Sequence, residues 1–312
     1  MKKRTVLAAA LAAVPAAALT GFYLRCFAPP ARRHDDSAPH GGQYEAKRRE
    51  LDELHAAALA DRYERVYMRS RDGLRLSGRH FPFSGGGGGP IVLFFHGYRS
   101  NALRDGGGLL KLMRGMGVDV LAPDQRAHGE SEGRAITFGV KERCDCLDWI
   151  QYILDRWGED KRIVLAGVSM GAATVLMASD RLPGNVLGIV ADCGYTTPEA
   201  ILRHVGKMQG LPVDAAMPLV RASARLLGGF DLRGASAPEA LGRCRTPVLL
   251  IHGEADGFVP CEMSRENYAA CAAPKRLLTI PGADHAMSFV IDEPAYTAAV
   301  REFLAECGAT AD

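Results

Sequence analysis

Short, continuous runs of apolar residues recur along the chain and predict buried strands. The clearest run is Ile91-Val92-Leu93-Phe94-Phe95, which no polar residue interrupts. Comparable runs lie at residues 118–122, 162–166, 186–191, 247–251 and 277–280. Runs of this kind are typical of parallel strands that are covered on both faces. Ahead of them, residues 65–69 and 74–81 flank Asp72-Gly73, which predicts an antiparallel hairpin.

Segments of helical length separate most of these runs. They lie at residues 103–116, 140–157, 171–181 and 262–272, and a last one follows the final strand at residues 295–307. Alternation of strands and helices predicts an α/β fold with an open, mostly parallel central sheet and helices on both faces. The catalytic domain of this fold is expected over residues 61–312.

One interval between two strands is too long for a simple crossover. Residues 196–245 contain helix-like pieces that Pro212, Pro218 and Pro238 interrupt. Whole crossovers typically start at about 10–12 residues, so about fifty residues predict an inserted helical cap.

The N-terminus has the pattern of a targeting segment. Lys2, Lys3 and Arg4 precede an uncharged stretch over residues 6–24. Its length approaches the roughly 20 residues of a spanning helix, which favours a signal anchor over residues 1–24 and a membrane-bound protein with its catalytic domain outside the cytoplasm. Small residues at Ala16 and Ala18 also allow a cleaved signal peptide and a secreted protein.

Residues 25–60 then predict a linker, rich in proline and glycine up to residue 42, and a leading helix. Since a linker carries no packing, the catalytic domain is expected to stay soluble and active without residues 1–42.

The charge balance argues against a nucleic-acid partner. The formal net charge is only +2, and no base-reading motif is present. The eight cysteines include no CxxC pair, so we expect mostly buried thiols and no zinc site. No dinucleotide fingerprint follows a strand, and no cofactor or metal is expected.

A strand, a sharp turn and a helix meet at Gly167-Val168-Ser169-Met170-Gly171. This arrangement predicts a nucleophile elbow, in which Ser169 lies at a strained turn and the two glycines avoid steric clashes. A serine hydroxyl needs a base to become a nucleophile, and histidine suits this role near neutral pH.

The order serine, acid, histidine along the chain selects the partners of Ser169. His285 follows the last predicted strand and is the candidate base, and Asp256 follows the preceding strand and is the candidate acid. The other residues considered are His204 and His252 as bases and Glu254, Asp192 and Asp284 as acids.

An acyl-transfer site also needs donors for the developing oxyanion. The backbone N–H of Met170 is one candidate, and the N–H of Tyr98, in the loop His96-Gly97-Tyr98, is the second. His96 and His128 are interpreted as structural residues of their loops.

Taken together, His96-Gly97, the loop 124–131, the elbow, Asp256 and His285 resemble the α/β-hydrolase family over about residues 60–308. The resemblance is to bacterial members with an N-terminal membrane segment, described as serine aminopeptidase-like or acyl-ester hydrolases. It implies hydrolysis of esters, thioesters or amides without metal or cofactor. Gln125 stands where relatives often have another residue, and it is expected to affect only loop packing.

We therefore predict a serine hydrolase that cleaves an ester or thioester through an acyl-serine intermediate. A serine aminopeptidase acting on short peptides and a non-catalytic binding protein on the same fold are the alternatives. The expected partner is a small-molecule or short-peptide substrate.

Overall fold

A computed structural model describes residues 16–29, 42–86 and 88–310 of the chain. Its centre is one sheet of eight strands in the order β1-β2-β4-β3-β5-β6-β7-β8. The strands are β1 Glu64–Arg69, β2 Arg75–Phe81, β3 Ile91–Phe95, β4 Asp119–Pro123, β5 Ile163–Val168, β6 Val186–Asp192, β7 Val248–Gly253 and β8 Lys275–Ile280.

The directions of the strands confirm the predicted sheet. β1 and β2 form the antiparallel hairpin, and β2 pairs antiparallel with β4. All later neighbours, from β4 to β8, run parallel. The carboxyl ends of β5, β7 and β8 therefore lie along one edge of the sheet, where loops can bring distant residues together.

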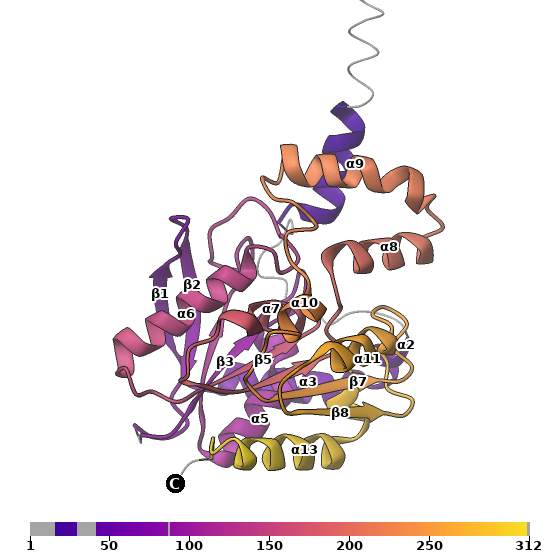
Figure 1. The fold of residues 1–312 in the computed structure, drawn as a ribbon. Coiled ribbons are helices and arrows are strands. Elements are labelled where there is room, and N and C mark those ends of the chain that lie inside the picture. Colours follow the sequence, from indigo (N-terminus) through magenta and orange to yellow (C-terminus); the bar gives the residue numbers. More distant parts are fainter. Residues whose placement is uncertain (1–15, 30–41, 87, 311–312) are drawn as a thin grey trace, which may run out of the picture.

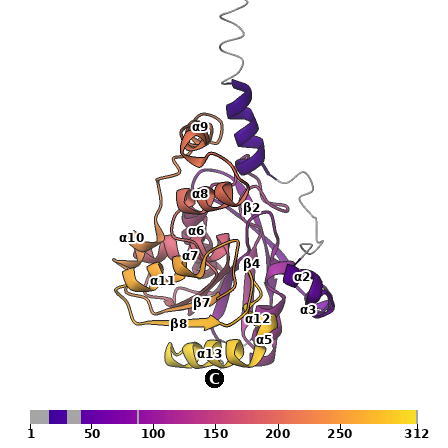
Figure 2. The ribbon, with the colours of Figure 1, turned by 90° about the vertical axis from the view of Figure 1, so that its right-hand side faces the viewer.

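Helices cover both faces of the sheet (Figure 1, Figure 2). They are α2 Gly42–Ala46, α3 Arg48–Ala60, α4 Ala102–Asp105, α5 Gly107–Met116, α6 Glu142–Trp157, α7 Met170–Ala178, α8 Pro198–Met208, α9 Val213–Leu226, α10 Ala237–Leu241, α11 Cys261–Ala270, α12 Ser288–Ile291 and α13 Glu293–Glu306. Residues 16–22 are also α-helical and continue into the π-helix η1 Tyr23–Phe27, and η2 Ser179–Arg181 is a 3-10 helix.

The central strands supply side chains to two separate core layers. In β3, Leu93 and Phe95 pack on the face covered by α6 and α7, whereas Val92 and Phe94 pack toward α5 and α13. Alternate residues of a strand point to opposite faces, so an uninterrupted apolar run places a hydrophobic side chain in both layers.

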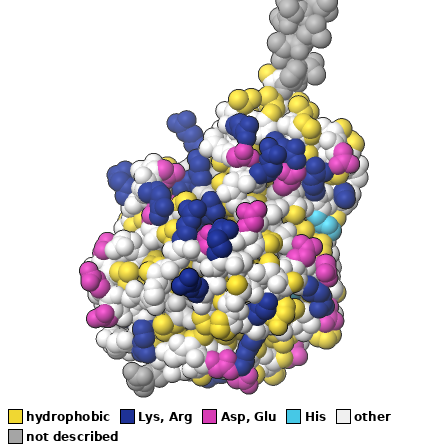
Figure 3. All heavy atoms as spheres, viewed as in Figure 1, with side chains coloured by type: hydrophobic (Ala, Val, Ile, Leu, Met, Phe, Trp, Pro, Cys, Tyr) yellow, Lys and Arg dark blue, Asp and Glu magenta, His cyan; other side chains and the backbone are white. Residues whose placement is uncertain are grey.

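The segment between β6 and β7 forms α8, α9 and α10. Helices α8 and α9 rise above the sheet, whereas α10 packs against α7 and α11 in the body of the domain (Figure 1). Pro218 lies inside α9 and does not end it, in contrast to the expected break. Hydrophobic side chains are visible on the surface of this end of the molecule (Figure 3).

The segment over residues 16–29 packs on the domain. It lies beside α9 in both views (Figure 1, Figure 2), and Phe27 is fully buried between Phe138 and Phe230. The expected linker from residue 25 is therefore wrong at its start, because Phe27 is part of the core. Residues 1–15, most of the predicted anchor over residues 1–24, and residues 30–41 of the predicted linker lie outside the described residues. Within the described ranges, no helix combines the length and the apolar character needed to cross a membrane.

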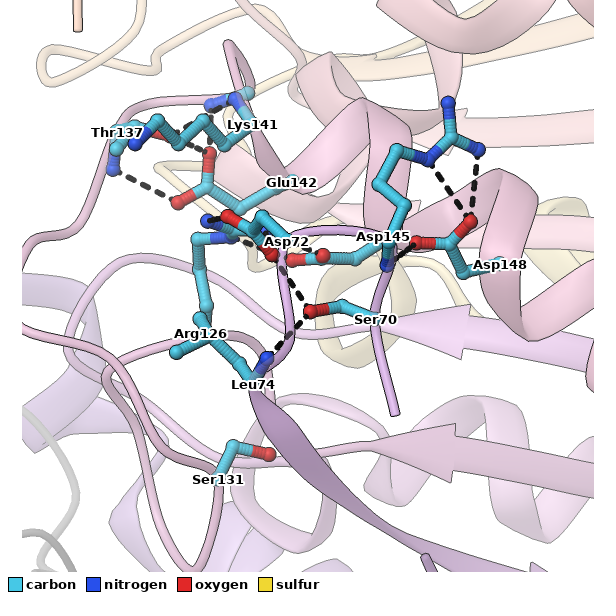
Figure 4. Close-up of polar contacts among 12 residues, drawn as sticks. Ser70, Asp72, Leu74, Arg126, Ser131, Thr137, Lys141, Glu142, Asp145 and Asp148 are labelled. Carbon is cyan, nitrogen blue, oxygen red and sulfur yellow. Dashed lines mark hydrogen bonds and ion pairs between the residues drawn. The ribbon is translucent and has the colours of Figure 1, made fainter. Parts of the chain in front are cut away.

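A buried ion pair fixes the loop that follows β4. Arg126 donates two hydrogen bonds to Asp145 of α6 and also binds Asp72 in the β1–β2 turn (Figure 4). Burial would raise the pKa of Asp72, but hydrogen bonds from Arg126 and Ser70 lower it to about 2. The loop 124–131 is thus tied to two elements that are distant in sequence.

The eight cysteines are all free thiols. Half of them are buried, and the other half are partly buried, so the expectation of mostly buried thiols holds only in part. The buried ones are Cys146, Cys193, Cys244 and Cys271.

Candidate active site

Ser169 lies at a strained turn between β5 and α7. Its φ is 56° and its ψ is −116°, a backbone conformation that is costly for a residue with a side chain. A Cβ on Gly171 would lie 1.9 Å from the carbonyl oxygen of Phe95, and a Cβ on Gly167 would lie 2.4 Å from the carbonyl carbon of Gly171. The two glycines are therefore required by the tightness of the elbow.

The structure brings Ser169, His285 and Asp256 together. Nε2 of His285 lies 2.9 Å from Oγ of Ser169, and Nδ1 of His285 lies 2.7 Å from Oδ2 of Asp256. An ionised carboxylate only accepts hydrogen bonds, so Nδ1 carries the proton and Nε2 accepts from the serine hydroxyl. This is the arrangement that a general base requires.

Asp256 is held in its ionised form. Burial would raise its pKa, but hydrogen bonds from His252, His285 and the backbone N–H of Val259 lower it to about 2. Its Oδ1 accepts from the N–H groups of Phe258 and Val259 at 2.9 and 2.8 Å. The carboxylate therefore stays charged at neutral pH and keeps its orientation toward His285.

His252, the alternative base, contacts Asp256 and is fully buried. Its Nε2–H points to the carbonyl oxygen of Val259 at 2.8 Å and lies 3.2 Å from Oδ2 of Asp256. Its Nδ1 accepts from the hydroxyl of Ser264 at 2.6 Å. With both nitrogens engaged in this way, His252 supports the acid and has no free nitrogen to serve as the base.

The remaining alternatives have other partners. Nε2 of His204 lies 3.2 Å from the carbonyl oxygen of Gly257, and Glu254 accepts from Thr279. Asp284 accepts from the N–H of His285 itself. Asp192 is buried below the site, where burial raises its pKa to about 6, and it accepts from Ser288 at 3.3 Å.

The predicted oxyanion loop lies against the nucleophile. A Cβ on Gly97 would be 3.4 Å from Cβ of Ser169, so Tyr98 follows directly at the site. Asp105 fixes this loop by accepting from the N–H of Gly97 at 2.7 Å. Met170 is the first residue of α7, where backbone N–H groups have no partner within the helix.

Both loop histidines have structural contacts, as predicted. Nε2 of His96 accepts from the N–H of Gln125 at 3.0 Å, and its Nδ1–H donates to the carbonyl oxygen of Gly97. The side chain of Gln125 donates to the carbonyl oxygen of His96. Nε2 of His128 accepts from the N–H of Arg99. Gln125 thus links the loop 124–131 to the loop that begins at His96.

Helix α2 holds the loop that carries His285. The Tyr44 hydroxyl donates to the carbonyl oxygen of His285 at 2.6 Å. Gln43 donates to the carbonyl oxygen of Gly282 and accepts from the N–H of Asp284. The sequence analysis missed these contacts because the leading helix shows no catalytic motif.

Two cavities meet at Ser169. One, of about 200 Å³, combines many apolar side chains with polar groups at Ser100, Asp105 and His285, and we call it the mixed cavity. The other, of about 260 Å³, extends under α8 and α9 and is mostly apolar. Tyr98 and Phe258 line both cavities.

A thiol lies beside the triad. One ligand atom each from Cys193, Asp256 and His285 falls within 4.8 Å of the others. Burial raises the pKa of the Cys193 thiol, and the nearby carboxylates of Asp192 and Asp256 raise it further. A metal needs a thiolate and free carboxylate and imidazole atoms, whereas this thiol stays protonated and the other two groups bind each other. We assign no metal to this group.

The chain is similar in sequence to several known proteins. The chain is similar to the uncharacterized protein YqkD of Bacillus subtilis, with 28% identity over 68% of this chain and 70% of the relative. It is also similar to the lysophosphatidylserine lipase ABHD12 of Danio rerio, with 28% identity over 60% of this chain and 49% of that protein.

Among solved structures, an esterase of Pyrococcus furiosus, Pf2001, matches with a TM-score of 0.65 and 22% identity, over 90% of this chain and 97% of that chain. This match supports the fold. The model of the alpha/beta hydrolase family matches residues 92–300. The sheet, the elbow and this match lead to one conclusion: the chain belongs to the alpha/beta hydrolase family.

Proposed function

We propose that the chain hydrolyses carboxylic esters or thioesters through an acyl-serine intermediate. The observation that carries the proposal is the continuous hydrogen-bonded path from the Ser169 hydroxyl through His285 to Asp256, with distances of 2.9 and 2.7 Å. The path ends on a carboxylate whose pKa is about 2.

In the first half of the reaction, Ser169 Oγ attacks the carbonyl carbon while Nε2 of His285 takes its proton. The carbonyl oxygen becomes an oxyanion, which the N–H groups of Tyr98 and Met170 stabilise. Asp256 stabilises the imidazolium. The imidazolium then protonates the departing alcohol or thiol, and the acyl group stays on Ser169.

In the second half, water replaces the alcohol. Nε2 of His285 takes a proton from the water molecule, whose oxygen attacks the acyl carbon. The second tetrahedral intermediate collapses, the proton returns to Ser169 Oγ, and the carboxylic acid leaves. The charge on His285 appears only in the transition states and the tetrahedral intermediates between them, so the fixed charge of Asp256 favours these species over the ground state.

The cavities favour esters over peptides with a free amino terminus. Such a terminus needs a carboxylate partner. Asp52 lines the mixed cavity but is exposed to solvent, and the other two carboxylates there already accept hydrogen bonds. Asp105 accepts from Gly97 and Ser100, and Asp192 accepts from Ser288. Two similar proteins are an esterase and a lysophosphatidylserine lipase, which supports ester hydrolysis.

A fluorophosphonate probe and small activated esters test the proposal together. The native protein is expected to label at Ser169 and to hydrolyse p-nitrophenyl acetate, and Ser169→Ala is expected to lose both. Ser84→Ala is the matched control, because Ser84 is distant from the elbow. Its backbone N–H donates to Asp119 at the start of β4, at the opposite end of the strands from Ser169. Absence of labelling in the native protein would refute the acyl-serine mechanism. Higher kcat/KM on aminoacyl-nitroanilides than on esters would favour the aminopeptidase.

A further inference from the structure

The mostly apolar cavity has a wall that comes from outside the catalytic domain. Its lining includes Ile201 and Val205 of α8 and Met217 and Val220 of α9, as expected for a cap. Phe22, Arg25 and Cys26 of the N-terminal segment line the same cavity. A chain segment about 140 residues before the nucleophile thus shares a cavity with it.

This wall is fixed by many contacts. The Tyr98 hydroxyl donates to the carbonyl oxygen of Cys26 at 3.0 Å. The N–H of Ile136 donates to the carbonyl oxygen of Phe27 at 2.7 Å. On the cap side, Ser223 of α9 donates to the carbonyl oxygen of Leu19 at 2.8 Å. The segment therefore joins the cap, through α9, to the oxyanion loop, through Tyr98.

Because the two cavities meet at Ser169, we expect each to hold a different part of the substrate. Ser169 lines both cavities, whereas His285 lines the mixed cavity and not the mostly apolar one. His285 protonates the leaving group in the proposed mechanism, so the alcohol or thiol leaves on the side of the mixed cavity. The acyl chain then occupies the apolar cavity.

We propose that the N-terminal segment forms one wall of the acyl-binding cavity and limits the length of the acyl chain, so that the substrate is a single-chain fatty acyl ester or thioester. This inference rests on the proposed function. The cavity has a volume of about 260 Å³. We therefore expect it to take an acyl chain of medium length and to exclude longer chains at the wall that includes Phe22 and Cys26.

A chain-length series of p-nitrophenyl esters on the full-length protein tests the proposal, with each ester kept below the concentration at which it forms micelles. In the native protein, kcat/KM is expected to rise from the acetate to the octanoate, by at most about fourfold per buried methylene, and to fall at the dodecanoate. Cys26→Trp places an indole in the cavity and is expected to lower the octanoate-to-acetate ratio of kcat/KM at least tenfold.

Leu24→Trp is the matched control, since Leu24 lies in the same segment with its side chain 59% exposed. Its octanoate-to-acetate ratio is expected to equal that of the native protein. Phe22→Ala is the second variant and enlarges the cavity. It is expected to raise the dodecanoate-to-octanoate ratio at least threefold, a gain that a misfolded protein could not show.

The outcomes separate the two proposals. If the native protein hydrolyses no ester, including the acetate, the proposed function fails. If it hydrolyses the acetate but kcat/KM does not rise toward the octanoate, the acyl cavity is refuted while the function stands. If the preference for the octanoate exists but neither Cys26→Trp nor Phe22→Ala changes the chain-length ratios, the role of the N-terminal segment is refuted.

Discussion

Phe27 offers a direct test of whether the N-terminal segment belongs to the folded domain. Its side chain is fully buried, and its ring lies edge-on to Phe138 at 6.0 Å and to Phe230 at 5.3 Å between centroids. Phe230 lies in the chain between α9 and α10, and Phe138 lies just before α6. Truncation to alanine would thus leave a void between the cap and the domain.

The expected loss of stability follows from the size of this void. Phe→Ala substitutions in cores cost about 3–5 kcal/mol, because the transfer free energy of the ring is lost and the cavity does not fully collapse. For a domain of this size, about 1 kcal/mol lowers the Tm by roughly 2 °C. We therefore expect Phe27→Ala to lower the Tm by about 6–10 °C.

Thermal unfolding followed by circular dichroism measures this effect. Leu24→Ala is the control: its exposed side chain is expected to contribute less than about 0.5 kcal/mol. A Tm of Phe27→Ala within 1–2 °C of the native value, roughly the change expected of a surface substitution, would mean that the segment separates from the domain before the domain unfolds. The reasoning about its packing would then be refuted.

Three further predictions concern the site and the N-terminus. Tyr44→Phe removes the hydrogen bond to the carbonyl oxygen of His285 and is expected to lower kcat on p-nitrophenyl acetate by roughly two- to tenfold at unchanged KM; an unchanged kcat would contradict a positioning role. Asp256→Asn is expected to destabilise the protein by about 2 kcal/mol at pH 7, because the pKa of Asp256 is held at about 2 instead of 3.8. A lowered pKa stabilises the folded state above the ordinary pKa, so this difference in urea unfolding should shrink as the pH falls from about 4 to 2, and a difference independent of pH would argue against it. Deletion of residues 1–15 is expected to release the protein from membranes with ester hydrolysis intact, whereas deletion of residues 1–28 is expected to lose stability and hydrolysis together; equal activity of the two proteins would show that the segment is dispensable.

Local sequence patterns are sufficient to predict the sheet and to select Ser169, Asp256 and His285 as the residues that meet at its edge. Continuous apolar runs mark buried strands whatever the rest of the chain does. Ser169, Asp256 and His285 each directly follow one of these runs or lie a few residues beyond it, and parallel strands end at the same edge of a sheet. The continuous helix α9 is harder to predict, because a proline such as Pro218 usually ends a helix. Its packing against the N-terminal segment stabilises the helix beyond what local propensity provides.

The supporting contacts of the site left no signal in the sequence. Tyr44 reaches His285 across 241 positions, and it does so through a backbone carbonyl, which any residue would offer. His252 is a candidate base because it follows Ser169 along the chain, and its contact with Asp256 depends on the turn over residues 256–259. Such contacts arise from tertiary geometry, so a pattern read along one chain does not contain them.

The N-terminal segment shows the same limit in a form that affects function. An apolar stretch followed by prolines indicates that a segment avoids water, but not which surface covers it. In the structure, two aromatic residues five positions apart meet different surroundings: Phe27 lies in the core and Phe22 lines the cavity. Stability and chain-length preference should therefore respond separately, the first to Phe27 and the second to Phe22. A segment that only tethered the domain would affect neither, so the two positions together distinguish a tether from a cavity wall.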